Sequence, residues 1–327
     1  MKKLIVLLCG VLVAQLVLAV IVFVSGEEYG AYEAEEKLLV FDVTAVDRIQ
    51  IENGSSSVVL TKQADKWVLP ELDDFPADQH NVVQLLDKLA AMKKGWPVAT
   101  TSGASRRFKV DEDEFERKLT LSTKENTLGQ LFIGDSPGFR KVHVRNSGDA
   151  EVFAVDFNTW EASADAGDWI DKRILAFSAE KLLQVEMPDF VLRREDDEMQ
   201  LADLTNQEEV NRQAIQTLVN NLSGLQIDSL LDEKDKPGSS TDEADFKLKV
   251  TLDPDETLTY YFFKQPSEEP YFLLKRSDFE DYFKIAEFHV NAIKQTTRDK
   301  LLVNAAEDVS GDMVDDESLN PEVELLD

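Results

Sequence analysis

The chain carries one order of predicted elements twice. Each copy runs from short alternating strands into an amphipathic helix and then into further strands, the pattern of a tandem repeat. In the first copy we expect strands at 46–52, 57–61 and 66–69, a helix after Pro76, and strands at 118–122, 128–133, 141–145 and 151–155. In the second we expect strands at 183–187, 190–192 and 199–201, a helix at 208–222, and strands at 246–252, 258–263, 271–275 and 282–285. The pattern predicts an α+β fold of two similar antiparallel-sheet units with covering helices.

Matching positions in the two copies lie about 130 residues apart, as in the pairs Leu119 with Leu248 and Phe153 with Phe283. The predicted organisation is an apolar N-terminal segment at 1–26, an acidic linker at 27–43, a first unit at 44–177, a second unit at 178–304 and an acidic tail at 305–327. The tail has many acids, no base and no aromatic residue. It cannot bury enough apolar surface to offset chain entropy, so we expect it to be disordered.

An apolar run precedes both copies. It begins at Leu4 and ends at Val24, and a helix of that length spans about 30 Å, the thickness of a bilayer core. Lys2 and Lys3 lie before the run, so the positive-inside rule places the N-terminus in the cytoplasm. We therefore expect a single-pass anchor in a bacterial inner membrane, with the body in the periplasm. A signal peptide cleaved near Ser25 is the alternative.

The chain is strongly acidic, with a net charge of −29 from 64 acids and 35 bases. A field of that sign repels nucleic acid and anionic membrane surfaces, so we expect neither as a partner of the body. The charge suits either a solvated exterior or an acidic docking face for a basic protein. The single cysteine, Cys9, lies in the apolar run, so the body can form neither a disulfide nor a thiolate metal site.

Motifs of catalysis and cofactor binding are missing from the sequence. The three histidines, His80, His143 and His289, are far apart and do not have the spacing of a metal site. There is no Gly-x-Ser-x-Gly nucleophile elbow, no phosphate-binding loop and no dinucleotide fingerprint. We expect no metal and no cofactor. A pair of carboxylates for hydrolysis stays open, because their separation is spatial.

One stretch at the end of the first copy stands out as a candidate partner-binding site. It contains Trp169, Asp171 and Arg173. Tryptophan and arginine are enriched at the centres of protein interfaces, which favours an exposed contact site. A packed junction, in which the tryptophan is buried and the arginine pairs with the aspartate, is the structural alternative.

Several segments resemble a bacterial family described as a domain of unknown function, family 4340. They lie at 65–69, 76–78, 82–89, 131–134, 142–145, 152–155 and 169–175. The resemblance covers most of 44–177 and the second unit more weakly, and His143 stands where relatives often have tyrosine. It implies an N-terminal membrane helix and genes beside an ABC-type permease, its ATPase and a gliding-motility-type auxiliary membrane protein. No catalytic residues of the family are known, so none are carried over.

These observations lead us to expect a non-enzymatic, membrane-anchored periplasmic accessory or scaffold protein of an ABC-type transport system. Its expected partner is the permease or an auxiliary membrane subunit. The alternative is a periplasmic binding protein for a lipid, glycan or peptide, with its site between the two units. A hydrolase built on carboxylates is the third hypothesis, and it requires two acids that converge in a cleft.

Overall fold

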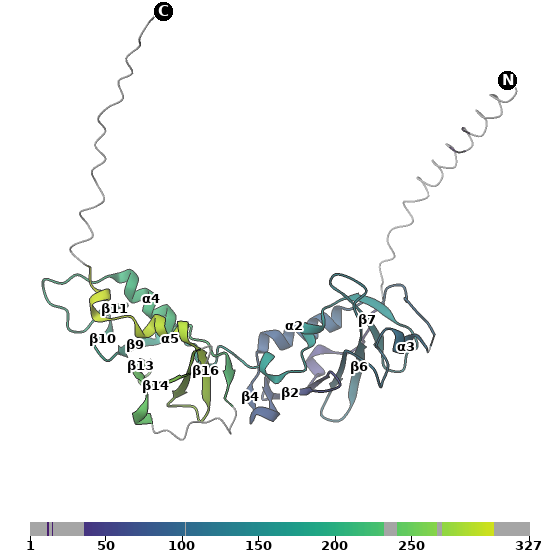
Figure 1. Cartoon of the computed structure of the whole chain (residues 1–327), viewed down its shortest axis with the longest axis horizontal. Coiled ribbons are helices and arrows are strands. Elements are labelled where there is room, and N and C mark those ends of the chain that lie inside the picture. Colours follow the sequence, from purple (N-terminus) through teal and green to yellow (C-terminus); the bar gives the residue numbers. More distant parts are fainter. Residues whose placement is uncertain are drawn as a thin grey trace, which may run out of the picture. The chain divides into compact units, whose positions relative to one another are not determined.

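The computed structural model describes residues 36–101, 103–231, 241–266 and 270–303, together with Leu12 and Gln15 (Figure 1). It divides into two compact units, 1–171 and 172–327, and each contains an antiparallel sheet of eight strands. The predicted α+β class is confirmed. Within the described part of the chain, no helix is both long and apolar enough to cross a bilayer. The predicted anchor lies outside the described residues, apart from Leu12 and Gln15, and so does the predicted tail.

Unit 1 is a sheet covered by one long helix. Its strand order is β4-β3-β2-β1-β5-β6-β7-β8. The strands are β1 (Arg48–Glu52), β2 (Ser57–Gln63), β3 (Lys66–Leu69), β4 (Phe75–Pro76), β5 (Arg117–Ser122), β6 (Thr127–Ile133), β7 (Lys141–Asn146) and β8 (Phe153–Asp156). The α-helices are α2 (Gln79–Ala91) and α3 (Ala104–Arg107), and the 3-10 helices are η2 (Val43–Ala45), η3 (Pro70–Leu72), η4 (Thr159–Ala162) and η5 (Ala166–Asp168).

The core of unit 1 follows from two periodicities. Alternate residues of β1, Ile49 and Ile51, are fully buried, as the period of a strand requires. Helix α2 buries one face, made of Val82, Leu85, Leu86 and Leu89. The carboxylate of Asp78 caps the helix by accepting from the backbone N–H groups of His80 and Asn81.

The last residues of the predicted linker pack onto unit 1. Leu38 and Leu39 are buried, and the Leu38 N–H donates to the Met92 carbonyl at 2.8 Å. Buried leucines and a backbone hydrogen bond mean that the segment from 38 onward belongs to the folded unit rather than to a spacer.

Unit 2 repeats this arrangement. Its strand order is β11-β10-β9-β13-β14-β15-β16-β12. The strands are β9 (Leu182–Glu186), β10 (Val191–Glu195), β11 (Glu198–Leu201), β12 (Ser229–Leu230), β13 (Phe246–Leu252), β14 (Glu256–Gln265), β15 (Tyr271–Arg276) and β16 (Tyr282–Ala286). The helices are α4 (Arg212–Ser223) and α5 (Glu287–Lys294), with 3-10 helices η6 (Ala179–Lys181), η8 (Thr241–Glu243) and η9 (Arg298–Leu301). The two sheets share seven strands in the same spatial order, β3-β2-β1-β5-β6-β7-β8 in unit 1 and β11-β10-β9-β13-β14-β15-β16 in unit 2. Each sheet adds one two-residue edge strand, β4 beside β3 in unit 1 and β12 beside β16, at the opposite edge, in unit 2.

The pairing registers of the two sheets also correspond. Leu119 pairs with Leu131 in unit 1, and Leu248 pairs with Tyr260 in unit 2. Near the other edge, Val144 pairs with Phe153, as Leu274 pairs with Phe283. These are the correspondences that the sequence offset predicts. A strand shifted by one residue would turn its apolar side chains to the opposite face, so matched registers indicate matched cores.

Each unit is closed by a short terminal segment that pairs with the residues before its long helix. We call these segments, 169–171 and 301–303, the clasps. In unit 1 the Asp78 N–H donates to the Trp169 carbonyl at 2.7 Å, and in unit 2 the Asn211 N–H donates to the Leu301 carbonyl at 2.8 Å. Trp169 and Leu301 are both buried. They are therefore equivalent residues of the two copies.

The residues after the first clasp belong to unit 2. The Ile227 N–H donates to the Lys172 carbonyl, and the Phe177 N–H donates to the Ser223 carbonyl. The structure thus divides the chain between Asp171 and Lys172, before the boundary expected at 177.

Candidate binding groove of unit 1

A groove of about 670 Å³ lies between α2 and the segment of unit 1 that holds η4, η5 and the first clasp. Its lining residues are Asn81, Gln84, Leu85, Asp87, Lys88, Trp160, Glu161, Ser163, Asp168 and Trp169. Binding pockets for small molecules measure about 300–1,000 Å³, so the size of the groove suits a ligand or a short peptide segment. All its residues come from one unit.

Helix α2 supplies the first wall of the groove. Asn81 and Lys88 are each three or four residues from Gln84 and Leu85, which places the four residues along one face of the helix. Leu85 is buried and forms the apolar base of this wall, whereas the polar side chains beside it are exposed. The same helix therefore supports the core on one face and the groove on the next.

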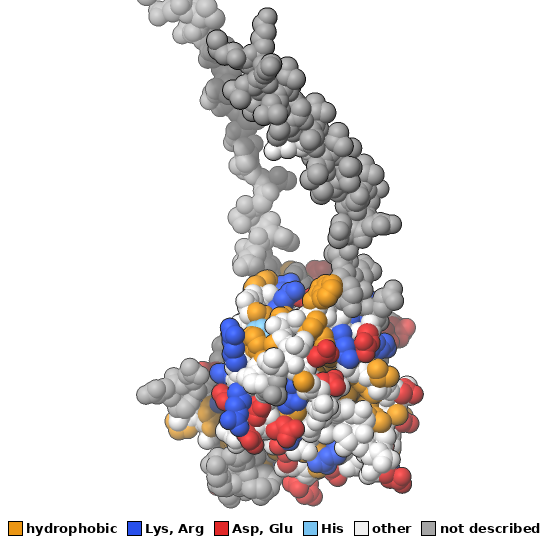
Figure 2. Space-filling view, turned by 90° about the vertical axis from the view of Figure 1, so that its right-hand side faces the viewer, with side chains coloured by type: hydrophobic (Ala, Val, Ile, Leu, Met, Phe, Trp, Pro, Cys, Tyr) orange, Lys and Arg blue, Asp and Glu red, His pale blue; other side chains and the backbone are white. Residues whose placement is uncertain are grey.

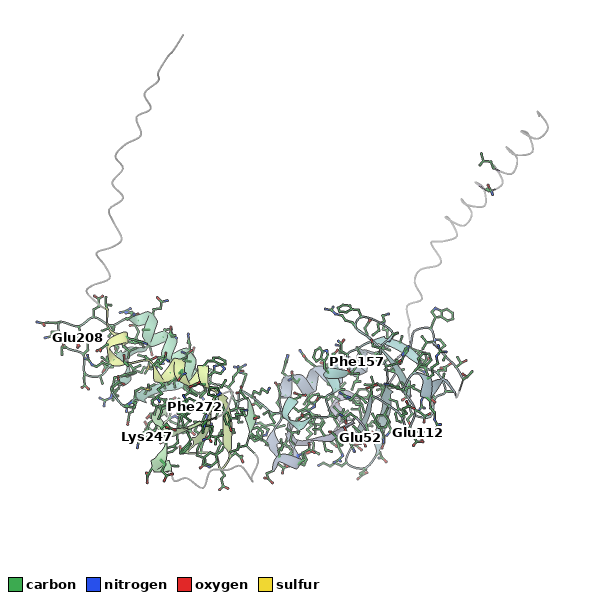
Figure 3. The ribbon with its side chains drawn as sticks, in the orientation of Figure 1. Glu52, Glu112, Phe157, Glu208, Lys247 and Phe272 are labelled. Atoms are coloured by element: carbon green, nitrogen blue, oxygen red, sulfur yellow. The ribbon has the colours of Figure 1, made fainter. Side chains whose placement is uncertain are left out.

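The second wall is held by a capping box at the start of η4. The Glu161 carboxylate accepts from the Asn158 backbone N–H at 3.0 Å and from the Asn158 side-chain amide at 2.8 Å. Its other oxygen accepts from the Lys88 ammonium, which joins the two walls. Lys88 Nζ also lies 5.8 Å from the centre of the Phe157 ring, a residue labelled in Figure 3.

Two tryptophans line the groove in different ways. Trp169 is 4% exposed, and its indole N–H donates to the Ser163 carbonyl at 2.9 Å, so it is a fixed part of the wall. Trp160 is 75% exposed. A large, exposed aromatic ring beside a concave surface is available to a partner in a way that the buried Trp169 is not.

The charge of the groove is negative. Asp87, Glu161 and Asp168 contribute carboxylates, and Lys88 is the one base of its lining. The Ser163 hydroxyl donates to Asp168 at 2.6 Å, which fixes that carboxylate at the edge of the groove. On the face drawn in Figure 2, acidic and basic side chains are interspersed with hydrophobic ones.

The three residues singled out in the sequence do not share one site in unit 1. Trp169 lies in the wall of the groove, and Asp171 lies in the clasp, where its N–H donates to the Pro76 carbonyl. Arg173 is exposed and belongs to unit 2. Their role as a partner-binding cluster stays a prediction. The sequence does not indicate Trp160 as a site residue, because spacing alone does not distinguish its exposed position from a buried one.

The histidines lie in separate environments. His80 contacts Gln84 at 2.7 Å on the surface of α2, and the His289 ring lies against the Phe288 ring in α5. His143 is buried, and its Nδ1 lies 2.7 Å from an Asp135 carboxylate oxygen. Among the described residues no three His, Cys, Asp or Glu side chains are grouped so that they could hold a metal ion.

One carboxylate has a strongly displaced pKa. The pKa of Glu208, which is labelled in Figure 3, falls to about 2, chiefly because the Arg298 guanidinium binds it and also because Thr205 donates to it. Its oxygens lie 2.7 and 2.9 Å from the guanidinium nitrogens. A general acid for hydrolysis needs a raised pKa, so the direction of this shift points to a structural ion pair.

The fold and the groove define a two-unit α+β protein with a candidate binding site on its first unit. The chain belongs to the family described as a domain of unknown function, DUF4340, whose model matches residues 67–249. The predicted resemblance is confirmed, and the match extends from unit 1 into β13 of unit 2. Comparison with curated proteins finds no match. Comparison with solved structures finds none either.

Proposed function

We propose that this protein is a non-enzymatic, membrane-anchored accessory protein of an ABC-type transport system, and that it binds a partner subunit through the groove of unit 1. The observation that carries the proposal is the exposed Trp160 beside a concave, acidic surface. Exposed tryptophan at a concavity is typical of residues that dominate binding energy at interfaces. The transport context comes from the family resemblance.

The anchored topology is supported by the sequence. The apolar run at 4–24 is long enough to span a bilayer, and Lys2 and Lys3 favour a cytoplasmic N-terminus. The chain has a single cysteine, Cys9, so a Cys9→Ser variant that carries Ser55→Cys in the exposed turn after β1 gives one reporter of sidedness. We expect a membrane-impermeant maleimide to label position 55 in spheroplasts, and protection until lysis would contradict a periplasmic body.

Partner binding is tested in intact membranes with a photoreactive residue in the groove. Trp160 is replaced by p-benzoylphenylalanine, and Trp96, which is equally exposed but outside the groove lining, is replaced in a matched control. We expect crosslinks from position 160 to a permease or auxiliary membrane subunit, identified by mass spectrometry. The proposal fails when position 160 gives no crosslink, or gives the same products as position 96.

A ligand-binding role is the second candidate, and the volume of the groove favours it. A lipid, glycan or peptide would pack its apolar part against the exposed Trp160 ring in the groove. Native mass spectrometry of protein extracted from its own membranes separates the candidates. A small molecule that remains bound, and is lost in a Trp160→Ala variant, would favour the ligand-binding role over the accessory role.

A further inference from the structure

The two walls of the groove are joined by one ion pair whose partners differ in exposure. The Glu161 side chain is 12% exposed and is held by two hydrogen bonds from Asn158. The Lys88 side chain is 46% exposed and reaches the groove from the surface of α2. The carboxylate is therefore a fixed acceptor. The ammonium can move into solvent with little loss of stability, because exposed ion pairs contribute only about 0–1 kcal/mol.

We propose that the groove receives a lysine- or arginine-bearing segment of a partner protein, and that the incoming cation takes the place of Lys88 at Glu161. This inference rests on the proposed function, because it specifies the chemistry of the partner at the same groove. Lys88 then acts as an internal competitor that occupies the acceptor until the partner binds.

Charge complementarity favours a basic segment. The lining contains three carboxylates, Asp87, Glu161 and Asp168, against the single ammonium of Lys88. An incoming cation that displaces Lys88 keeps Glu161 paired, and the displaced ammonium is solvated at the rim. An acidic segment would place its charge beside these carboxylates, and like charges at an interface oppose binding.

The aromatic lining of the groove also favours a basic segment. Trp160 presents an exposed ring at the groove, and tryptophan is the side chain that attracts lysine and arginine most strongly over its face. Leu85 and Trp169 line the groove but are almost fully buried, so the exposed Trp160 ring supplies most of the apolar contact for residues beside the cation. A basic residue flanked by apolar residues therefore fits this surface better than a purely hydrophilic chain.

The length of the groove favours a peptide segment over a small cation. Its helical wall runs from Asn81 to Lys88, and this part of α2 is about 11 Å long at 1.5 Å per residue. An extended chain covers that distance with about three residues. We therefore expect the occupant to be an extended stretch or loop of the partner subunit.

The test uses the full chain in detergent and a panel of dye-labelled pentapeptides, each with a central arginine or lysine between leucine, valine or phenylalanine residues. Citrulline replaces arginine in matched control peptides and removes only the charge. Fluorescence anisotropy measures the dissociation constants. We expect at least one arginine peptide to bind about tenfold more tightly than its citrulline control, a gain typical of a charge-assisted contact.

Variants of the groove sharpen this result. Lys88→Gln removes the ammonium that competes with the peptide for Glu161. The affinity for the arginine peptide should therefore rise about threefold, which corresponds to the free energy of an exposed ion pair. Glu161→Gln keeps an oxygen for Asn158 but loses the charge, so affinity should fall to that of the citrulline peptide. Trp160→Ala should weaken binding about tenfold or more. Lys124→Gln and Trp96→Ala, which alter exposed residues outside the groove, should change nothing.

Each contrary outcome overturns the inference. No binding by any peptide of the panel, equal binding of arginine and citrulline peptides, or weaker binding by Lys88→Gln would each exclude the displacement of Lys88. Spermidine that competes as well as the best peptide would show a site for small cations instead of a protein segment. Crosslinking from position 160 tests the proposed function separately. If a partner is captured there but no peptide binds, the accessory role remains supported and only the recognition of a basic segment at Glu161 is rejected.

Discussion

Units 1 and 2 share seven strands in the same order and the same clasp, but they differ in the segment between the last of these strands, β8 or β16, and the clasp. In unit 2 this segment forms α5, which packs against α4 and buries Val290 and Ile293 completely. In unit 1 it contains only the short η4 and η5, and the groove lies between them and α2. The shared parts maintain the fold, and the candidate site lies where one copy departs from the other.

The largest expected effect comes from removing a clasp. Trp169→Ala should destabilise unit 1 by about 3–5 kcal/mol, and Leu301→Ala should destabilise unit 2 by about 2–5 kcal/mol, because each leaves a cavity at an equivalent buried position. All four tryptophans, at positions 67, 96, 160 and 169, lie in unit 1. Fluorescence during urea unfolding therefore reports unit 1 alone, while far-UV circular dichroism reports both units.

The comparison predicts that the two clasp variants shift the fluorescence and circular dichroism transitions differently. Trp169→Ala should move the fluorescence transition to lower urea, and Leu301→Ala should move only part of the circular dichroism transition. Identical shifts of both probes in both variants would show that the two units unfold together. Each clasp would then not stabilise its own unit alone.

A buried arginine in unit 2 gives the next largest effect. Arg276, 6% exposed, binds both oxygens of Asp278 at 2.7 and 2.9 Å and donates to the Leu175 carbonyl at 3.0 Å. It pairs with Tyr260 across the sheet, as Asn146 pairs with Leu131 in unit 1. Arg276→Asn transfers the residue of unit 1 into unit 2, and it should cost about 2 kcal/mol through lost charged hydrogen bonds.

The measurement is again urea unfolding, followed by circular dichroism. The matched variant Lys275→Arg leaves Arg276 in place, and its midpoint should not change. A stability for Arg276→Asn equal to that of the unaltered chain would show that Arg276 does not hold the Leu175 segment to unit 2, and that the arginine is dispensable in this copy of the fold.

The sequence predicts the repeated architecture well, because its signals are local. The strand period of Ile49 and Ile51 and the helix period of Val82 to Leu89 both follow from burial of one face. The two-residue edge strands β4 and β12 are too short to give such a period, and the sequence does not predict them. The difference between η4–η5 and α5 is also hidden, because these segments are too short to give a clear helical period.

The candidate site depends on contacts that sequence periods do not report. Trp160 and Trp169 lie in one stretch, and which of them is buried depends on the distant pairing of Ala77 with Ile170 at the clasp. Lys88 and Glu161 are likewise brought together only by the packing of η4 beside α2. The acidic composition suits either a solvated exterior or a basic partner, and it does not indicate where on the chain such a partner would bind.

A smaller effect concerns pH and unit 2. The pKa of Glu208 is about 2 in the fold because Arg298 binds it, whereas an unfolded glutamate has a pKa of about 4.3. A lowered folded pKa means that the ion pair stabilises the fold above about pH 4.3, and that this stability is lost as the pH falls toward about 2. Glu208→Gln should therefore lower the melting temperature at pH 7 and reduce its fall between pH 5 and about pH 2.

The matched control is Glu209→Gln, which changes the neighbouring glutamate and leaves the ion pair of Glu208 with Arg298 in place. Differential scanning calorimetry across this pH range measures the effect. An unchanged acid dependence in Glu208→Gln would show that the Arg298 pair does not contribute to the stability of unit 2.

The smallest expected effect on stability comes from Trp160. Three quarters of this side chain is exposed, so Trp160→Ala should change the free energy of unfolding of unit 1 by no more than about 0.5 kcal/mol. The remaining tryptophans still report the urea transition, and Trp169→Ala in the same unit is the matched contrast. A loss as large as that of Trp169→Ala would make Trp160 a packing residue of η4. In that case the difference between the two units would serve folding, and the exposed ring would no longer support a binding role for the groove.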